Sequence, residues 1–326
     1  MNYRGIAYVM GTLLVVTGVA MLAPAVVATI YGENDLAALL ISAVVSCAIG
    51  LPLRLGFSHG NVLDTRDAIA IAAFGWIIIS AVSTLPFILH GSIPSFTDAF
   101  FEMMSGYTTT GATILTDIEV VPHGLIFWRS ETHLLGGMGF LTLTIIFLPH
   151  GVAGLRIFRA ESSPGQVITR ERFTARNRDA ITYLWVIYLS LNLLQVILMC
   201  AGGMSLFDSL CHAFGTVSTS GYSPYNASIG HYQNAYFDWI IILFMFLGGV
   251  TFMLFYHAAR REWKVIRINT EFRWYLGFLL FFCSAATWLL WTDGTYGFVD
   301  SLRYGTFQVV SLLTTTGFTT TDYELW

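Results

Sequence analysis

Long apolar stretches dominate this chain of 326 residues and limit what it can fold into. Its mean hydropathy is +0.66 and only 11% of its residues are charged, whereas a soluble domain carries about 25%. A helix that crosses a lipid bilayer needs about 20 mostly apolar residues. Stretches of that length lie at 5–30, 36–57, 68–90, 124–149, 181–203, 236–258 and 274–292. The sequence therefore predicts an all-α polytopic membrane protein that is embedded in a lipid bilayer.

The basic residues indicate how these spans are oriented. If the N-terminus is inside and the crossings alternate, fourteen of the 16 Lys and Arg residues fall in inside segments, and only Arg129 and Arg303 do not. Because inside loops of membrane proteins are enriched in Lys and Arg, this pattern predicts a cytoplasmic N-terminus. The predicted external segments are acidic and contain Glu33, Asp35, Asp98, Asp117, Glu119, Asp208, Asp293, Asp300 and Asp322.

Three amphiphilic stretches, at about 96–107, 205–217 and 302–313, are too short to cross the bilayer. They fit re-entrant helices, which enter the membrane and turn back. Each one is followed by a block of hydroxyl residues that ends in glycine, and all three blocks fall on the external side in this topology. The blocks are Thr108, Thr109, Thr110 and Gly111; Ser218, Thr219, Ser220 and Gly221; and Thr314, Thr315, Thr316 and Gly317.

The surroundings of these blocks indicate an internal repeat. A polar residue lies nine positions before each glycine, namely Glu102, His212 and Gln308. Asp98 and Asp208 both lie thirteen before theirs, where they can cap or charge the start of the short helix. A Leu–Gly–Gly triplet, at 135–137 and 247–249, follows the first two blocks. The repeating unit is helix, short helix, polar turn, helix; it occurs twice complete and a third time incomplete.

The blocks have a physical rationale as an ion path. Non-helical backbone at membrane depth is tolerated only where it lines a water-filled path or is buried in protein. Rings of backbone carbonyl oxygens can replace the hydration shell of K⁺, and glycine permits the positive φ that turns successive carbonyls inward. The C-termini of the short helices add about half a negative charge each. A single such block is more typical of a turn, but three at one offset favour a cation filter.

These blocks, together with the segment Leu135–Gly136–Gly137–Met138–Gly139, resemble those of the Trk, Ktr and HKT superfamily of K⁺ transporters, most closely its TrkH-type subunits. The resemblance covers the whole chain. It implies K⁺-channel-like repeats around a pseudo-fourfold pore, with about two and a half repeats and two N-terminal helices here. It also implies that the twelve residues of the three blocks bind the transported K⁺. A glycine in every strand is the family pattern for K⁺ preference.

The resemblance implies partners and a location as well. We expect a homodimer in the bacterial cytoplasmic (inner) membrane, with a cytosolic nucleotide-binding regulatory subunit of the RCK type, which the Arg-rich segment 154–178 could dock. We expect no nucleic-acid partner, no organic cofactor and no enzyme activity. The expected domains are 1–62 (two N-terminal helices), 63–153 (first repeat), 154–178 (cytoplasmic loop), 179–268 (second repeat) and 269–326 (third repeat). Since the fourth repeat is missing, either the chain is a fragment of a longer transporter, which we favour, or a further polypeptide completes the pore.

An alternative function is a carrier for a small polar solute, in which the Thr–Gly blocks are helix breaks at the substrate site. Inverted repeats would place the breaks on opposite sides of the membrane, whereas the three blocks face one side, which favours the pore. Arg129, Glu131 and His133 lie in one predicted span, and we expect Arg129 to form a buried structural pair, through Glu102. Arg303 should begin the third re-entrant helix, in a snorkelling or structural role.

Overall fold

The computed structural model describes residues 1–57, 64–139, 177–323 and 326, and within these ranges it contains helices, turns and loops but no strand. This confirms the all-α prediction. The described residues form two compact units. Unit 1 comprises Met1–Thr108, 112–139 and 177–182, and unit 2 comprises Thr109–Gly111 and Tyr183–Trp326.

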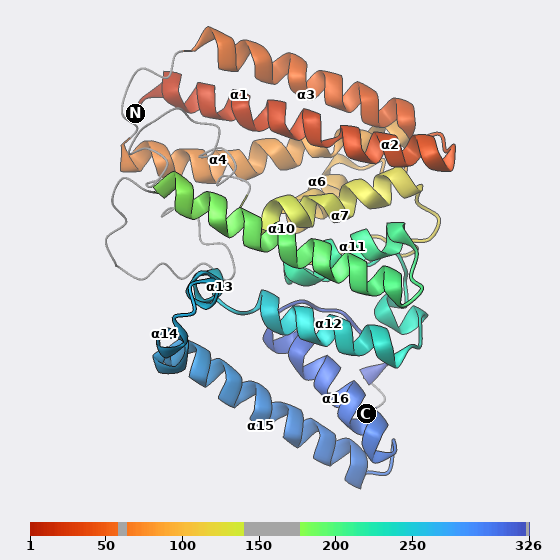
Figure 1. Cartoon of the computed structure of the whole chain (residues 1–326). Helices are drawn as coiled ribbons and strands as arrows, with labels where there is room; N and C mark the ends of the chain where they lie inside the picture. Colours follow the sequence, from red (N-terminus) through yellow and green to blue (C-terminus); the bar gives the residue numbers. More distant parts are fainter. Residues whose placement is uncertain (58–63, 140–176, 324–325) are drawn as a thin grey trace. The chain divides into compact units, whose positions relative to one another are not determined.

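Unit 1 is a bundle of helices of different lengths. Its helices are α1 (Tyr3–Ala20), α2 (Leu22–Tyr31), α3 (Leu36–Gly56), α4 (Thr65–Ser83), α5 (Leu85–His90), α6 (Phe96–Tyr107) and α7 (His123–Gly137). Helices α1 and α3 lie side by side, and α4 packs against α1 (Figure 1). The short helix α6 contacts both α4 and α7. A short helix in contact with two longer ones is the arrangement expected of a pore helix.

Glycines allow the backbones of α1 and α3 to approach closely. A Cβ atom at Gly11 would lie 2.7 Å from the carbonyl oxygen of Gly50, and one at Gly50 would lie 2.8 Å from the carbonyl oxygen of Gly11. Small residues at such crossings are typical of helix pairs in membranes, where close packing replaces the hydrophobic effect as the driving force.

Unit 2 contains the second and third short helices. Its elements are most of α10 (Asn177–Ala201), α11 (Leu206–Val217), η1 (Ser228–His231), α12 (Ala235–Gly248), α13 (Phe252–Ala259), α14 (Trp263–Ile268), α15 (Thr270–Thr292) and α16 (Phe298–Leu313). Helix α15 packs along α16, and α12 contacts both α11 and α16 (Figure 1). The order helix, short helix, turn, helix therefore recurs in this unit.

Five helices in the described ranges are long and apolar enough to cross a membrane. They are Tyr3–Tyr31, Leu36–Gly56, Arg66–His90, Thr182–Ala201 and Thr270–Thr292, in agreement with five of the predicted spans. The prediction of one continuous helix over 236–258 is wrong, because α12 and α13 are bent by 94° at a break. The last ten residues of the predicted span 124–149 lie outside the described residues, and α7 ends at Gly137.

Two of the three short helices have nearly the predicted bounds, and the third is longer. Helices α6 and α11 begin within one residue of the prediction, whereas α16 begins at Phe298 rather than at about 302. The Ser301 amide donates to the carbonyl of Gly297, which extends α16 by one turn at its start. Arg303 consequently lies inside this helix and does not begin it.

The α1–α3 contact predicts a large difference between two glycine substitutions. Gly11→Leu should separate the helices and destabilise the protein by about 1–3 kcal/mol, as overpacking of a close contact does. Gly277→Leu is the matched control, because a Cβ atom at Gly277 of α15 would meet no described atom within 4 Å. Thermal unfolding midpoints of the two variants in detergent measure the difference. Equal midpoints would contradict the close α1–α3 packing.

Candidate ion-conduction site

The three Thr/Ser–Gly turns share one backbone conformation. In each turn, the second residue and the glycine both have positive φ. The angles are 53° and 78° for Thr109 and Gly111, 55° and 79° for Thr219 and Gly221, and 60° and 83° for Thr315 and Gly317. Positive φ is a genuine outlier for a β-branched residue such as Thr and costs about 1–3 kcal/mol. Its occurrence at one position in all three turns indicates that the surrounding structure imposes this conformation.

The hydroxyl groups of the turns hydrogen-bond to the ends of the short helices. The first hydroxyl of each turn donates to the carbonyl four residues earlier, namely Thr108 to Met104, Ser218 to Phe214 and Thr314 to Val310. In the second and third turns the first hydroxyl also contacts the third, Ser220 and Thr316 respectively. These hydroxyls therefore support the backbone at the point where each helix ends.

The three turns converge within unit 2, to which Thr109–Gly111 belong. A Cβ atom at Gly111 would overlap the carbonyl oxygen of Ser220, and one at Gly221 would overlap the carbonyl oxygen of Thr316. Each of these two glycines thus faces the carbonyl of the residue just before the glycine of the next turn. The first turn therefore contacts the second and the second contacts the third. The three turns, residues 108–111, 218–221 and 314–317, are called strands below, although none is a β-strand.

Glycines of the Leu–Gly–Gly triplets lie against the short helices. A Cβ atom at Gly136 of α7 would overlap the carbonyl oxygen of Tyr107, and one at Gly248 of α12 would lie 2.9 Å from the carbonyl oxygen of Val217. Tyr107 and Val217 both lie four residues before the glycine of the turn that follows. The triplets therefore let the following helix pack closely against the carbonyl end of the short helix.

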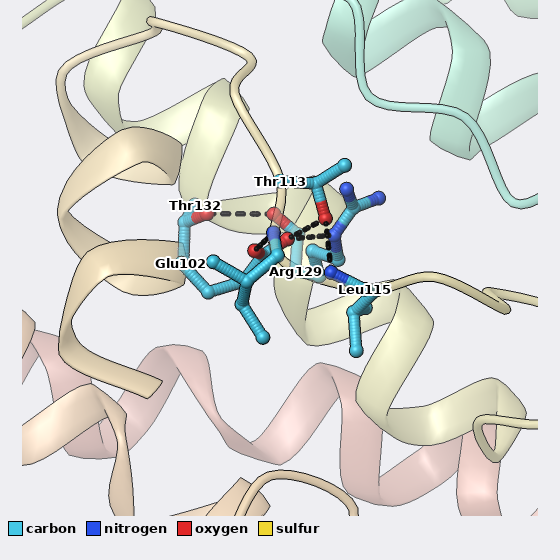
Figure 2. A network of polar contacts seen from close by, with 6 residues as sticks. Glu102, Thr113, Leu115, Arg129 and Thr132 are labelled. Carbon is cyan, nitrogen blue, oxygen red and sulfur yellow. Dashed lines mark hydrogen bonds and ion pairs between the residues drawn. The ribbon is translucent and has the colours of Figure 1, made fainter. Parts of the chain in front are cut away.

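Glu102 and Arg129 form the expected buried pair. The Nε–H of Arg129 donates to Oε1 of Glu102 at 2.6 Å, and the two side chains are 1% and 0% exposed. Figure 2 shows this pair with Thr113, which also donates to Oε1 of Glu102. The pair links α6 to α7, and it confirms the structural role that we predicted for Arg129.

Two acidic side chains of the predicted external face bind the start of helix α7. The backbone amides of His123 and Leu125, at the start of α7, donate to Glu33 and Asp35. Carboxylates stabilise a helix N-terminus in this way. Burial raises the pKa of Asp35 above its ordinary value.

The starts of α6 and α11 are capped by serines that the sequence prediction overlooked. Ser95 accepts from the Asp98 amide and Ser205 from the Asp208 amide. Asp98 and Asp208 lie in the first turn, where they supply charge. The spacing of Ser three residues before Asp resembles a capping box and could have revealed the serines.

Arg303 has a partner that the sequence prediction also overlooked. Its Nε lies 3.5 Å from Oδ2 of Asp238 in α12, and its Nη2 lies 3.0 Å from Oδ1 of Asp300 in its own helix. Asp238 is buried within a stretch of large apolar residues, so its position alone could have indicated a buried partner. Arg303 therefore joins α16 to α12, which confirms a structural role.

The strand contacts predict that substitutions of the turn glycines differ in cost. In Gly221→Ala the new side chain is strained by the positive φ and also overlaps the carbonyl of Thr316. In Gly317→Ala the positive φ is the only strain, because no described atom lies within 4 Å of the Cβ position. Gly221→Ala should be the more destabilising by about 1–3 kcal/mol. Thermal midpoints in detergent test this, with Gly294→Ala as a loop control of similar φ. A larger loss for Gly317→Ala would refute the strand order.

Comparisons with known proteins agree with this arrangement. The sequence profile of the TrkH family, described as a cation transport protein, matches residues 37–326. The chain is 32% identical to the Trk system potassium uptake protein TrkH of Halomonas elongata and 33% identical to that of Salmonella typhimurium, and in each case all of the chain aligns with 68% of the relative. The crystal structure of the potassium transporter TrkH from Vibrio parahaemolyticus superposes with a TM-score of 0.86 at 29% identity, over all of this chain and 67% of that one. This chain therefore belongs to the TrkH family of multi-pass bacterial membrane proteins, which transport cations and are not enzymes.

Proposed function

We propose that this protein takes part in K⁺ uptake across the cytoplasmic membrane, as the membrane subunit of a Trk system. K⁺ passes along the backbone carbonyls of the three strands, residues 108–111, 218–221 and 314–317. One observation carries the proposal: the same pair of left-handed residues recurs in all three strands, and the glycines of two of them face carbonyls of the next. Relatives of about a third identity are named potassium uptake proteins, which supports K⁺ as the ion.

The chemistry of the strands suits a dehydrated monovalent cation. Removing water from an ion is costly unless other oxygens replace it, and rings of backbone carbonyls do so for K⁺. Helices α6, α11 and α16 end directly before the strands, so their C-termini contribute about half a negative charge each. The family resemblance implies four strands, and we place the fourth beside Gly317, on the side that faces none of the described strands.

The remaining assignments follow from the sequence pattern and the resemblance. We place the N-terminus in the cytoplasm and keep the domain boundaries given above, with K⁺ as the transported ion and no organic cofactor. We also propose a homodimer with a cytosolic nucleotide-binding subunit. The basic loop 154–178, which would dock that subunit, lies outside the described residues except for its last two.

Filter glycines should control ion discrimination. Gly111→Ser or Gly221→Ser should displace the neighbouring carbonyl and let Na⁺ compete with K⁺ about tenfold better, which corresponds to roughly 1.4 kcal/mol of lost differential binding. The measurement is Rb⁺ uptake with Na⁺ as competitor, in K⁺-uptake-deficient bacteria that express the gene. Gly91→Ser is the matched control, since Gly91 has a φ of +87° but no described atom within 4 Å of its Cβ position. Unchanged discrimination in both filter variants would remove the filter assignment.

Charge segregation predicts opposite exposure for two alanines. Ala227 and Ala259 are both exposed in the structure, and the topology places Ala227 outside and Ala259 inside. Each alanine is replaced by cysteine in a background that lacks the four native cysteines. A cysteine at 227 should react with a membrane-impermeant maleimide only from the outside, and one at 259 only from the inside. Intact cells and inverted vesicles distinguish the two cases. Reaction of both from the same side would overturn the parallel arrangement of the strands.

A further inference from the structure

The chain just past the first filter glycine is tied back to the helix before the filter (Figure 2). Thr113, two residues after Gly111, donates its hydroxyl proton to Oε1 of Glu102 at 2.9 Å. The amide of the next residue, Ile114, donates to Oε2 at 2.9 Å. Glu102 is the polar residue nine before the glycine, and it is fully buried. Its carboxylate therefore connects helix α6, which precedes the filter, to residues 113 and 114, which follow it.

The second repeat contains the same tie, with different chemistry. Nδ1 of His212 lies 2.8 Å from the carbonyl oxygen of Asp208, and Nε2 lies 3.1 Å from the hydroxyl of Ser223. A carbonyl only accepts, so Nδ1 carries the proton and Nε2 accepts from Ser223. His212 is nine residues before Gly221, and Ser223 is two residues after it. Positions and connectivity therefore match those of Glu102 and Thr113.

A second hydrogen bond also joins equivalent positions in the two repeats. The amide of Leu115 donates to Oγ1 of Thr113 at 3.0 Å, and the amide of Tyr225 donates to Oγ of Ser223 at 3.1 Å. In both repeats the hydroxyl two residues after the glycine thus accepts from the amide four residues after it and donates to the buried polar residue. A carboxylate and a neutral imidazole differ in shape and charge, but both can accept a hydrogen bond from a hydroxyl. Accepting this hydrogen bond is therefore the role that Glu102 and His212 share.

The third turn is held in another way. Thr319, two residues after Gly317, contacts the segment around η1: its amide donates to Ser228, and its carbonyl accepts from the Gly230 amide. Ser311 donates to the carbonyl of Phe318. Each turn is therefore fixed on the side that follows its glycine, and two of the three use the tie.

We propose that Thr113 with Glu102, and Ser223 with His212, are positioning residues that set the discrimination between K⁺ and Na⁺ by fixing the strand end after the filter glycine. A strand that is held on one side only can move its carbonyls toward a smaller ion, because nothing limits the shift. The hydrogen-bonded tie limits it. This inference rests on the proposed function, since it assigns a role to residues next to the proposed filter.

Arg129 makes the first tie more rigid than the second. Its Nε–H binds the Oε1 atom that also accepts from Thr113, and hydrogen bonds to charged groups are roughly twice as strong as neutral ones. In the second tie the imidazole is held by a backbone carbonyl of its own helix. Loss of the first tie should therefore have the larger effect on discrimination.

Thr113→Val tests the first tie, because it removes the hydroxyl and keeps the side-chain volume. We expect K⁺/Na⁺ discrimination, measured by Na⁺ competition with Rb⁺ uptake, to fall about tenfold or more, as the loss of one hydrogen bond to a charged group implies. Thr113→Ser keeps the hydroxyl and should restore it. Hydrogen exchange at the amides of Ile114 and Leu115 should be about tenfold faster in Thr113→Val, whether or not the protein transports.

Ser223→Ala tests the second tie and replaces the first test if Thr113→Val does not accumulate in the membrane. Unchanged discrimination and unchanged exchange in Thr113→Val, or unchanged discrimination in Ser223→Ala, would overturn the proposal. Failure of both variants to accumulate, with normal accumulation of Thr113→Ser, would also overturn it, since the hydroxyls would then serve folding alone. Gly221→Ser, measured in parallel, separates this inference from the proposed function. If that variant changes discrimination and the hydroxyl variants do not, only the ties are refuted.

Discussion

The carbonyl oxygens of Ser220 and Thr316 occupy the space where Gly111 and Gly221, respectively, have no Cβ atom. This contact requires two backbones to approach more closely than any side chain would allow, and it therefore requires glycine. It also requires the strands to be held in a left-handed conformation, which Thr109, Thr219 and Thr315 adopt against their own preference. The short helices and the hydroxyls that hold their ends can be understood as the support for that strained backbone.

The same demand for close approach extends beyond the strands. Gly136 and Gly248 bring the next helix against the last carbonyls of α6 and α11, and Gly11 and Gly50 bring α1 against α3. In lipid, helices gain little from apolar burial against one another, and packing at short distance supplies much of the attraction. Glycine is therefore used both where the three turns meet and where the helices pack against one another.

The sequence predicted those features that depend on composition and spacing. Five of the long spans and the bounds of α6 and α11 follow from apolar length and from the residues at the helix ends. The Glu102–Arg129 pair could be predicted because a buried cation needs a nearby acid. The sequence did not reveal the bend between α12 and α13, since Phe252 and its neighbours are as apolar as a continuous span. Asp238 was missed because its partner, Arg303, is remote in sequence and only the fold brings them together.

The bend has a mechanical consequence for the second repeat. Up to Gly248, helix α12 is fastened to the carbonyl end of α11. The amide of Gly249 still donates to the carbonyl of Met245, but that of Val250 donates to Leu247, and the next helix, α13, begins at Phe252 with Thr251 as its N-cap. The continuous ladder of helical hydrogen bonds ends there, so a torque applied to α13 is not carried into α12. A rotation of α13 at the bend would therefore leave the contact between α12 and the end of α11 in place.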